Sequence, residues 1–214
     1  MRLSSRFLVW IACLSAGLAA VPASARPIGC PAASSAHAGF IITLTNEEAF
    51  QIDRIVGDIT YLRHLDNRLN TISSEELYRG LFTLVSDGPR GRSVFTYDLD
   101  PAVLFPLQGA GIYAVGGSMI DSRGRTSRVE RTIEVVDGGT RQLEQLYNVY
   151  GLCFYNVKRI LAATVWPSLG LEFRQEKLWS DSLRAVLYLR TEVYQNGVLS
   201  RVTEYDGKYI DFLE

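Results

Sequence analysis

The sequence predicts an α+β fold, in which N-terminal helices and one further long helix pack on an antiparallel sheet that ends in a three-stranded meander. Two kinds of pattern predict this fold. Apolar residues recur at steps of three and four in the N-terminal half and again within 140–161, which is typical of amphipathic helices. Near the C-terminus, apolar runs are instead separated by Asn196-Gly197 and Asp206-Gly207, dipeptides that are typical of tight β-hairpins.

Two N-terminal helices are indicated by capping boxes. Thr45 and Glu48 have the spacing of such a box, and apolar residues follow at helical spacing as far as Leu69. A second Ser-x-x-Glu box at 73–76 opens a shorter helix that runs through Leu84.

The third predicted helix follows Gly138-Gly139, where apolar steps of three and four run from Leu143 to Leu161. Within it, 152–165 stays open between helix and strand, because "LCFY" is also typical of a strand. Trp166-Pro167 ends the element, since the residue before proline avoids helical backbone angles. The segments expected to be strands in the first two thirds of the chain are 40–44, 93–98, 111–121 and 127–136, the last two joined as a hairpin by "SRGR".

The C-terminal meander comprises 183–194, 198–205 and 208–213. If Asn196-Gly197 forms a two-residue turn, Glu192 lies opposite Arg201 and Tyr188 lies opposite Tyr205, which are favourable cross-strand pairs.

This register predicts a candidate ligand site. It places Glu204 and Asp211 as diagonal neighbours on the apolar face of the sheet, and Arg131 lies on the apolar side of the 127–136 hairpin. Arg131, Glu204 and Asp211 would then be the polar groups of a pocket between helices and sheet, since ligand pockets are mostly apolar with a few convergent polar residues. The alternative is that these charges reach solvent near strand ends.

The N-terminus has the pattern of a secretory signal peptide over 1–25. Two arginines precede a short apolar run, and Ala23-Ser24-Ala25 provides a cleavage site. Residues 26–39, rich in Ala, Ser and Pro, are expected to form a flexible leader, and 40–214 a single domain. Cleavage would leave 20 basic and 23 acidic residues, a net charge of −3 that does not favour nucleic acid.

The mature chain would keep two cysteines, Cys30 and Cys153. In an exported protein these are expected to form one disulfide bond, worth about 4–5 kcal/mol in the chain-entropy model for so long a loop. The alternative is a lipid anchor on Cys30. After the leader, no apolar segment is long enough to span a membrane.

The sequence therefore predicts a periplasmic or secreted envelope protein that is not an enzyme and that binds a small or amphiphilic ligand, or a partner protein of the envelope. We expect no cofactor, no catalytic residue and no metal site, because His37 and His64 are the only histidines. Two alternatives remain open. One is a hydrolase or isomerase that uses Glu204 and Asp211 as a carboxylate pair. The other is a structural subunit of an envelope complex, docking through a tyrosine-rich face formed by Tyr188, Tyr194 and Tyr205.

Overall fold

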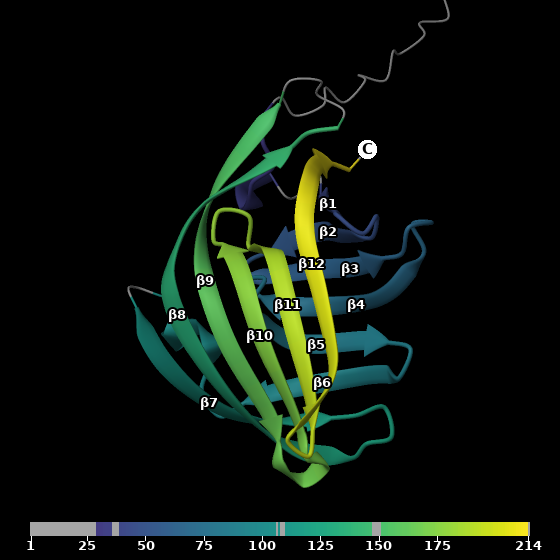
Figure 1. Cartoon of the computed structure of the whole chain (residues 1–214), viewed down its shortest axis with the longest axis vertical. Helices are drawn as coiled ribbons and strands as arrows, with labels where there is room; N and C mark the ends of the chain where they lie inside the picture. Colours follow the sequence, from purple (N-terminus) through teal and green to yellow (C-terminus); the bar gives the residue numbers. More distant parts are fainter. Residues whose placement is uncertain (1–28, 36–38, 106, 108–109, 147–150, 214) are drawn as a thin grey trace, which may run out of the picture.

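The protein forms a closed barrel in which each strand pairs antiparallel with the next in sequence and the last strand closes onto the first (Figure 1). The computed structural model describes residues 29–35, 39–105, 107, 110–146 and 151–213. The strands are β1 (Phe40–Leu44), β2 (Ala49–Val56), β3 (Ile59–Leu65), β4 (Thr71–Tyr78), β5 (Phe82–Gly88), β6 (Gly91–Tyr97), β7 (Gly111–Ile120), β8 (Thr126–Glu144), β9 (Leu152–Trp166), β10 (Leu171–Ser180), β11 (Ala185–Gln195) and β12 (Val198–Phe212).

The predicted α+β fold is wrong, because each segment expected to be a long helix forms strands and the turns between them in the described residues. The predicted helix from Thr45 to Leu69 is β2 and β3, the helix opened at 73–76 is β4 and β5, and 140–161 is the end of β8 and most of β9. The helices in the described residues are single 3-10 turns, η1 (Ala33–Ser35), η2 (Pro101–Leu104) and η3 (Pro167–Leu169).

A bulge and a tight turn produce the helix-like spacing in β2 and β3. The pairing of β2 with β3 shifts between Ile52 and Arg54, and an extra residue at a bulge turns a two-residue step into a three-residue one. Gly57 then takes a left-handed φ of 57° in the turn Gly57-Asp58. Gly-Asp between two β-branched runs is itself typical of a hairpin turn, so the sequence also contained the pattern that predicts two strands here.

The expected strands at 40–44, 93–98, 111–121, 127–136 and 183–194 are all present, as β1, β6, β7, part of β8 and β11. The Asn196-Gly197 turn is confirmed, with φ values of 50° and 79°. No turn forms at Asp206-Gly207, which lies inside the continuous strand β12. The three-stranded meander is therefore wrong, and β12 instead pairs with β11 along its first part and with β1 along its last.

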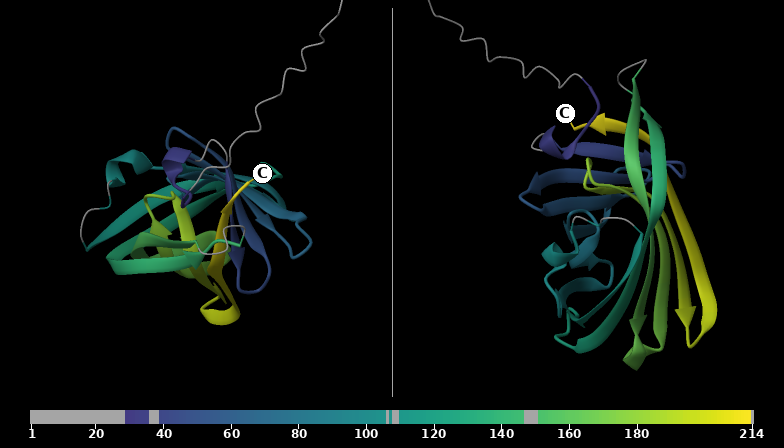
Figure 2. Two further views of the ribbon diagram at one scale, coloured as in Figure 1. Left: turned by 90° about the horizontal axis from the view of Figure 1, so that it is seen from above. Right: turned by 90° about the vertical axis from the view of Figure 1, so that its left-hand side faces the viewer.

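The strong twist of the sheet divides the barrel into two crossing layers. β1 to β6 run across the molecule, whereas β8 to β12 run steeply along it (Figures 1 and 2). Two apolar clusters fill the interior at one end. Residues that share the first cluster come mainly from β1, β2, β9, β11 and β12, and those of the second include Leu81, Phe82, Leu104, Leu107 and Trp179.

Connections between strands pack tightly over this filled end. The Nε1 of Trp179 donates to the carbonyl oxygen of Arg79 at 2.9 Å, and the hydroxyl of Thr60 donates to the carbonyl oxygen of Arg184 at 3.2 Å. Gly80 has a left-handed φ of 68°, and a Cβ there would lie 1.7 Å from the same Arg184 oxygen. Only glycine fits this position, so we call this the closed end of the barrel.

Residues before β1 are attached to the closed end. Cys30 and Cys153 are joined by a disulfide bond, the pair expected from the sequence. The hydroxyl of Tyr155 donates to the carbonyl oxygen of Pro31 at 3.0 Å. The backbone amide of Ala33 donates to the carbonyl oxygen of Ser182 at 2.7 Å. The predicted signal peptide lies outside the described residues, as does part of the leader.

Candidate functional site

A cavity of about 730 Å³ opens at the end of the barrel opposite the closed end. Its rim consists of the β5–β6 and β7–β8 turns together with η3, and we call it the mouth cavity. Its volume lies within the range of about 300–1,000 Å³ that is usual for small-molecule sites. The side chains that line it include Ser73, Ser86, Met119, Trp166, Leu171 and Phe173.

Aromatic and apolar side chains form one wall of the mouth cavity. The rings of Trp166 and Phe173 meet edge to face with centroids 5.1 Å apart, and Leu171 lies two positions before Phe173 on β10. The Nε1 of Trp166 is buried and has no hydrogen-bond partner within the described residues. A buried N–H without a partner costs free energy.

The inward face of β10 leads from the mouth cavity to the centre of the barrel. Side chains on a strand alternate between the two faces, so Phe173, Gln175, Lys177 and the buried Trp179 all point inward. The intervening Glu176 points outward, where it accepts a hydrogen bond from Nε of Arg159 at 2.7 Å.

Lys177 is a buried cation in the barrel interior. Burial lowers its pKa most, the positive charge of Arg131 lowers it as well, and Glu75 opposes both effects, which together leave the pKa at about 7. Burial likewise raises the pKa of Glu75, against the attraction of Lys177, Arg131 and His64. Within the described residues neither Lys177 nor Glu75 makes a direct ion pair or side-chain hydrogen bond, and both remain partly accessible to water. Neither of them lines the mouth cavity itself. Lys177 lies four positions beyond Phe173 on β10, and Glu75 pairs across the sheet with Ser86, and both Phe173 and Ser86 line the cavity.

Arg131 is the third charged group of this interior, and it is held by neutral partners. Its Nε donates to the hydroxyl of Thr164 at 3.1 Å and its Nη1 to the hydroxyl of Tyr97 at 3.4 Å. Burial raises the pKa of Tyr97, which keeps the phenol neutral. We call Glu75, Arg131 and Lys177 the interior charge cluster; it holds two cations and one acid.

The predicted site residues Arg131, Glu204 and Asp211 are not brought together. Arg131 points into the barrel as expected, but Glu204 is exposed on the outer face. Asp211 is buried beside the β8–β9 connection, where its Oδ2 accepts from the backbone amide of Leu146 at 3.1 Å. These three residues therefore form no common pocket.

A β-bulge explains why Glu204 does not lie on the predicted face. The sequence predicts Glu192 opposite Arg201, but Arg201 pairs with Val193 instead. Because Tyr194 pairs with Leu199, Ser200 is an extra residue in β12. A one-residue slip turns every later side chain to the opposite face. As a result Glu204 points outward.

The same slip separates the predicted tyrosine-rich face. Tyr205 points inward, where its ring contacts those of Phe50 and His64 edge to face at 5.6 and 5.1 Å. Tyr194 stays on the outer face, where its hydroxyl donates to Glu192 at 2.9 Å. His64 also lies in the interior, with its Nε2 at 2.7 Å from a carboxylate oxygen of Glu48.

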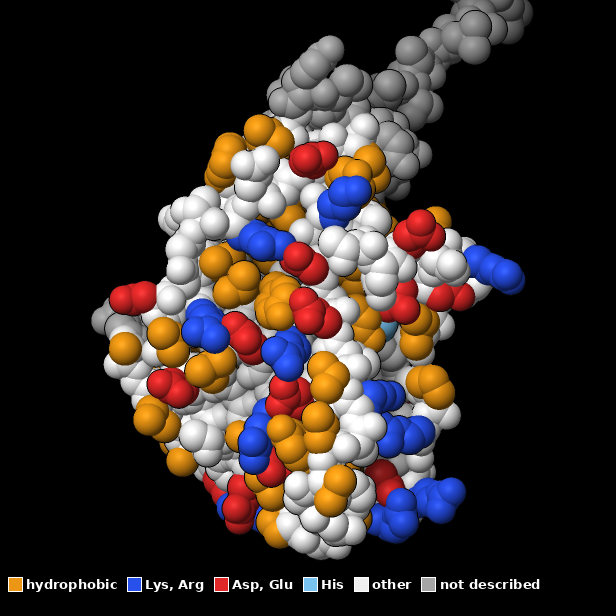
Figure 3. Space-filling view, in the orientation of Figure 1, with side chains coloured by type: hydrophobic (Ala, Val, Ile, Leu, Met, Phe, Trp, Pro, Cys, Tyr) orange, Lys and Arg blue, Asp and Glu red, His pale blue; other side chains and the backbone are white. Residues whose placement is uncertain are grey.

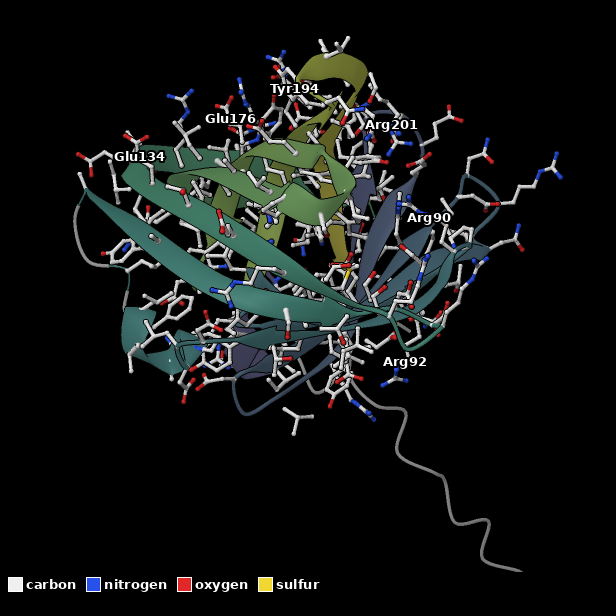
Figure 4. All side chains as sticks on the ribbon, turned by 90° about the horizontal axis from the view of Figure 1, so that it is seen from below. Arg90, Arg92, Glu134, Glu176, Tyr194 and Arg201 are labelled. Carbon is white, nitrogen blue, oxygen red and sulfur yellow. A yellow bond between two sulfur atoms is a disulfide. The ribbon has the colours of Figure 1, made fainter. Side chains whose placement is uncertain are left out.

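A second depression of about 310 Å³ lies on the outer face of β8 to β11. Charged side chains of both signs alternate over this face (Figure 3). Those around the depression include the ion pairs Arg174–Glu172 at 2.6 Å and Arg190–Glu192 at 2.8 Å. Glu134, Glu176 and Tyr194 lie on this outer side, apart from Arg90 and Arg92 of the β5–β6 hairpin (Figure 4). Since its charges largely satisfy one another, this surface offers a ligand less than the mouth cavity does.

The described residues contain no group of three or more His, Cys, Asp and Glu side chains that could hold a metal ion. They also contain no helix of the length and apolar character needed to cross a membrane.

Comparisons with known proteins identify no family. No family model matches the chain, and no curated protein matches it. Among solved structures, the hypothetical lipoprotein YmcC from Escherichia coli (K12) is similar at 10% identity with a TM-score of 0.44, over 81% of this chain and 86% of that one. A likeness at this level does not indicate a shared function.

Proposed function

We propose that this protein is an exported envelope protein that binds one small amphiphilic ligand inside its barrel and does not act on it chemically. The observation that carries the proposal is the mouth cavity, from which the inward face of β10 leads to the interior charge cluster. The polar part of the ligand would contact the interior charge cluster. Its apolar part would pack against Trp166, Leu171 and Phe173.

Export is supported by the signal-peptide pattern and by the disulfide bond between Cys30 and Cys153, since such bonds persist in oxidising compartments. The enzyme alternative loses its basis, because Glu204 is exposed on the outer face whereas Asp211 is buried beside Leu146. The tyrosine face of the structural-subunit alternative is likewise divided between interior and exterior.

The proposal is tested with an uncharged apolar dye, N-phenyl-1-naphthylamine, whose fluorescence rises in apolar surroundings. We expect saturable binding of one dye per chain. Ser86→Trp places a large side chain on the inward face of β5 at the mouth cavity, and should weaken dye binding at least about tenfold by filling the site. Ala163→Trp is the matched control, because it fills the outer depression instead and should leave dye binding unchanged.

Loss of binding in the Ala163→Trp variant with retention in Ser86→Trp would move the site to the outer face. Absence of saturable binding to the wild-type protein would overturn the proposal. Thermal unfolding of both variants checks that each still folds.

A further inference from the structure

The charges around the mouth cavity and in the interior indicate the sign of the ligand's charge, which the shape of the cavity does not. Of the interior charge cluster, Arg131 and Lys177 are cations and Glu75 is the single acid. Arg131 donates to hydroxyl groups, so no acid in direct contact neutralises it. A bound anion would have two cations to pair with in a site that is largely shielded from water, where such contacts are strong.

Arginines at the rim of the mouth cavity have the same sign. Arg90 and Arg123 line the cavity, and within the described residues their side chains have no hydrogen-bond or ion-pair partner. The acid among the lining residues, Asp121, is already engaged, because it accepts from the backbone amides of Arg123 and Arg125 at 2.9 Å and pairs with the Arg125 side chain at 2.7 Å. The path from rim to interior is therefore positive overall.

We propose that the ligand carries an anionic oxyacid head group, a carboxylate or a phosphate, which lies between Lys177 and Arg131 while its apolar part occupies the mouth cavity. This inference rests on the proposed function and adds the sign of the ligand's charge. Glu75 would repel the head group and so set its position on the side of the two cations.

The experiment displaces N-phenyl-1-naphthylamine at pH 6 with amphiphiles that share a twelve-carbon chain and differ in head group. They are dodecanoate, dodecyl phosphate, dodecyl maltoside and dodecyltrimethylammonium. We expect the two anions to bind about tenfold to a hundredfold more tightly than the cation, as charge-assisted hydrogen bonds allow. The ratio between dodecanoate and dodecyl phosphate distinguishes the two oxyacids.

Two variants of opposite sign separate charge from packing. Lys177→Met should weaken dodecanoate binding about tenfold, whereas Glu75→Gln should strengthen it, and neither should change binding of dodecyl maltoside by more than about twofold. Lys208→Met, on an exposed lysine of β12, is the control and should have no effect. Equal binding of anions and cation would overturn this inference alone. If neither the dye nor any amphiphile binds, the proposed function fails as well.

Discussion

Replacing Lys177 by methionine should stabilise the fold, and by an amount that depends on pH. Burial lowers the pKa of Lys177 from 10.5 to about 7. A difference of that size corresponds to about 5 kcal/mol by which the folded state disfavours the protonated lysine, an upper figure because the side chain still meets some water. Methionine has a similar length and no charge, so we expect a gain of about 3–5 kcal/mol in the free energy of unfolding at pH 6.

The gain should shrink as pH rises. Between pH 7 and 10.5 the unfolded chain holds the lysine proton and the folded protein has released it, so wild-type stability increases with pH across this window. The charged and titratable groups that face Lys177 are Glu75 on β4 and Arg131 on β8, with His64 and Tyr97 nearby. Glu75 already has a raised pKa, and removing the lysine would raise that pKa further. The Lys177→Met variant would therefore lose stability as pH rises, which adds to the decrease in its gain.

Urea denaturation at pH 6 and pH 9 measures the effect, and the gain from Lys177→Met should fall by about 2–3 kcal/mol between them. Lys208→Met is the control for removing a surface lysine, with a change within about 0.5 kcal/mol at both pH values. A Lys177→Met variant that is less stable than wild type at pH 6, or a gain that is the same at both, would refute the placement of this lysine in the interior.

Three further outcomes follow from the closed end and the strands around it, each read by urea denaturation. Gly80→Ala should cost about 2–4 kcal/mol, because its Cβ would meet a backbone oxygen. Gly57→Ala has a similar φ but nothing within 4 Å of its Cβ, so it should cost only about 1 kcal/mol. Equal costs would contradict the close packing at Gly80. Reducing the disulfide should lower the free energy of unfolding by about 4–5 kcal/mol, and an unchanged midpoint would argue against the bond. Asp211→Ala should cost about 1–3 kcal/mol because a backbone amide loses its acceptor, and exposed Glu204→Ala should cost less than about 0.5 kcal/mol; the reverse order would restore the register predicted from sequence.

Strands could be predicted from sequence where one face is regularly apolar, and were missed where a bulge or an interior polar residue broke the alternation. β6, β7 and β11 keep a two-residue period and were found. β2 has a bulge after Ile52, which imitates helical spacing. β12 contains Asp206-Gly207, a dipeptide typical of hairpins, but no turn forms there. Gly207 instead lets β12 approach β1 and β11 closely, because a Cβ at this position would lie 2.9 Å from the carbonyl oxygen of Leu187.

Of the interior charge cluster, only Arg131 was predicted from the sequence. Arg131 was found because it interrupts an otherwise apolar face of β8. Lys177 was missed because β10 was not predicted as a strand, although Leu171, Phe173 and Trp179 lie on the same face as Lys177 at two-residue spacing. Glu75 was assigned to a helix. Its interior position depends on pairing with β3 and β5, which local spacing does not reveal.

The native mass of the protein recovered from its own cell envelope, before and after denaturation, tests the ligand-binding account most directly. The account predicts a polypeptide beginning at Arg26, together with an additional mass of one small acidic molecule that is lost on denaturation. The same mass before and after denaturation would contradict the ligand. An addition that stays on a chain beginning at Cys30 would instead mean a lipid anchor.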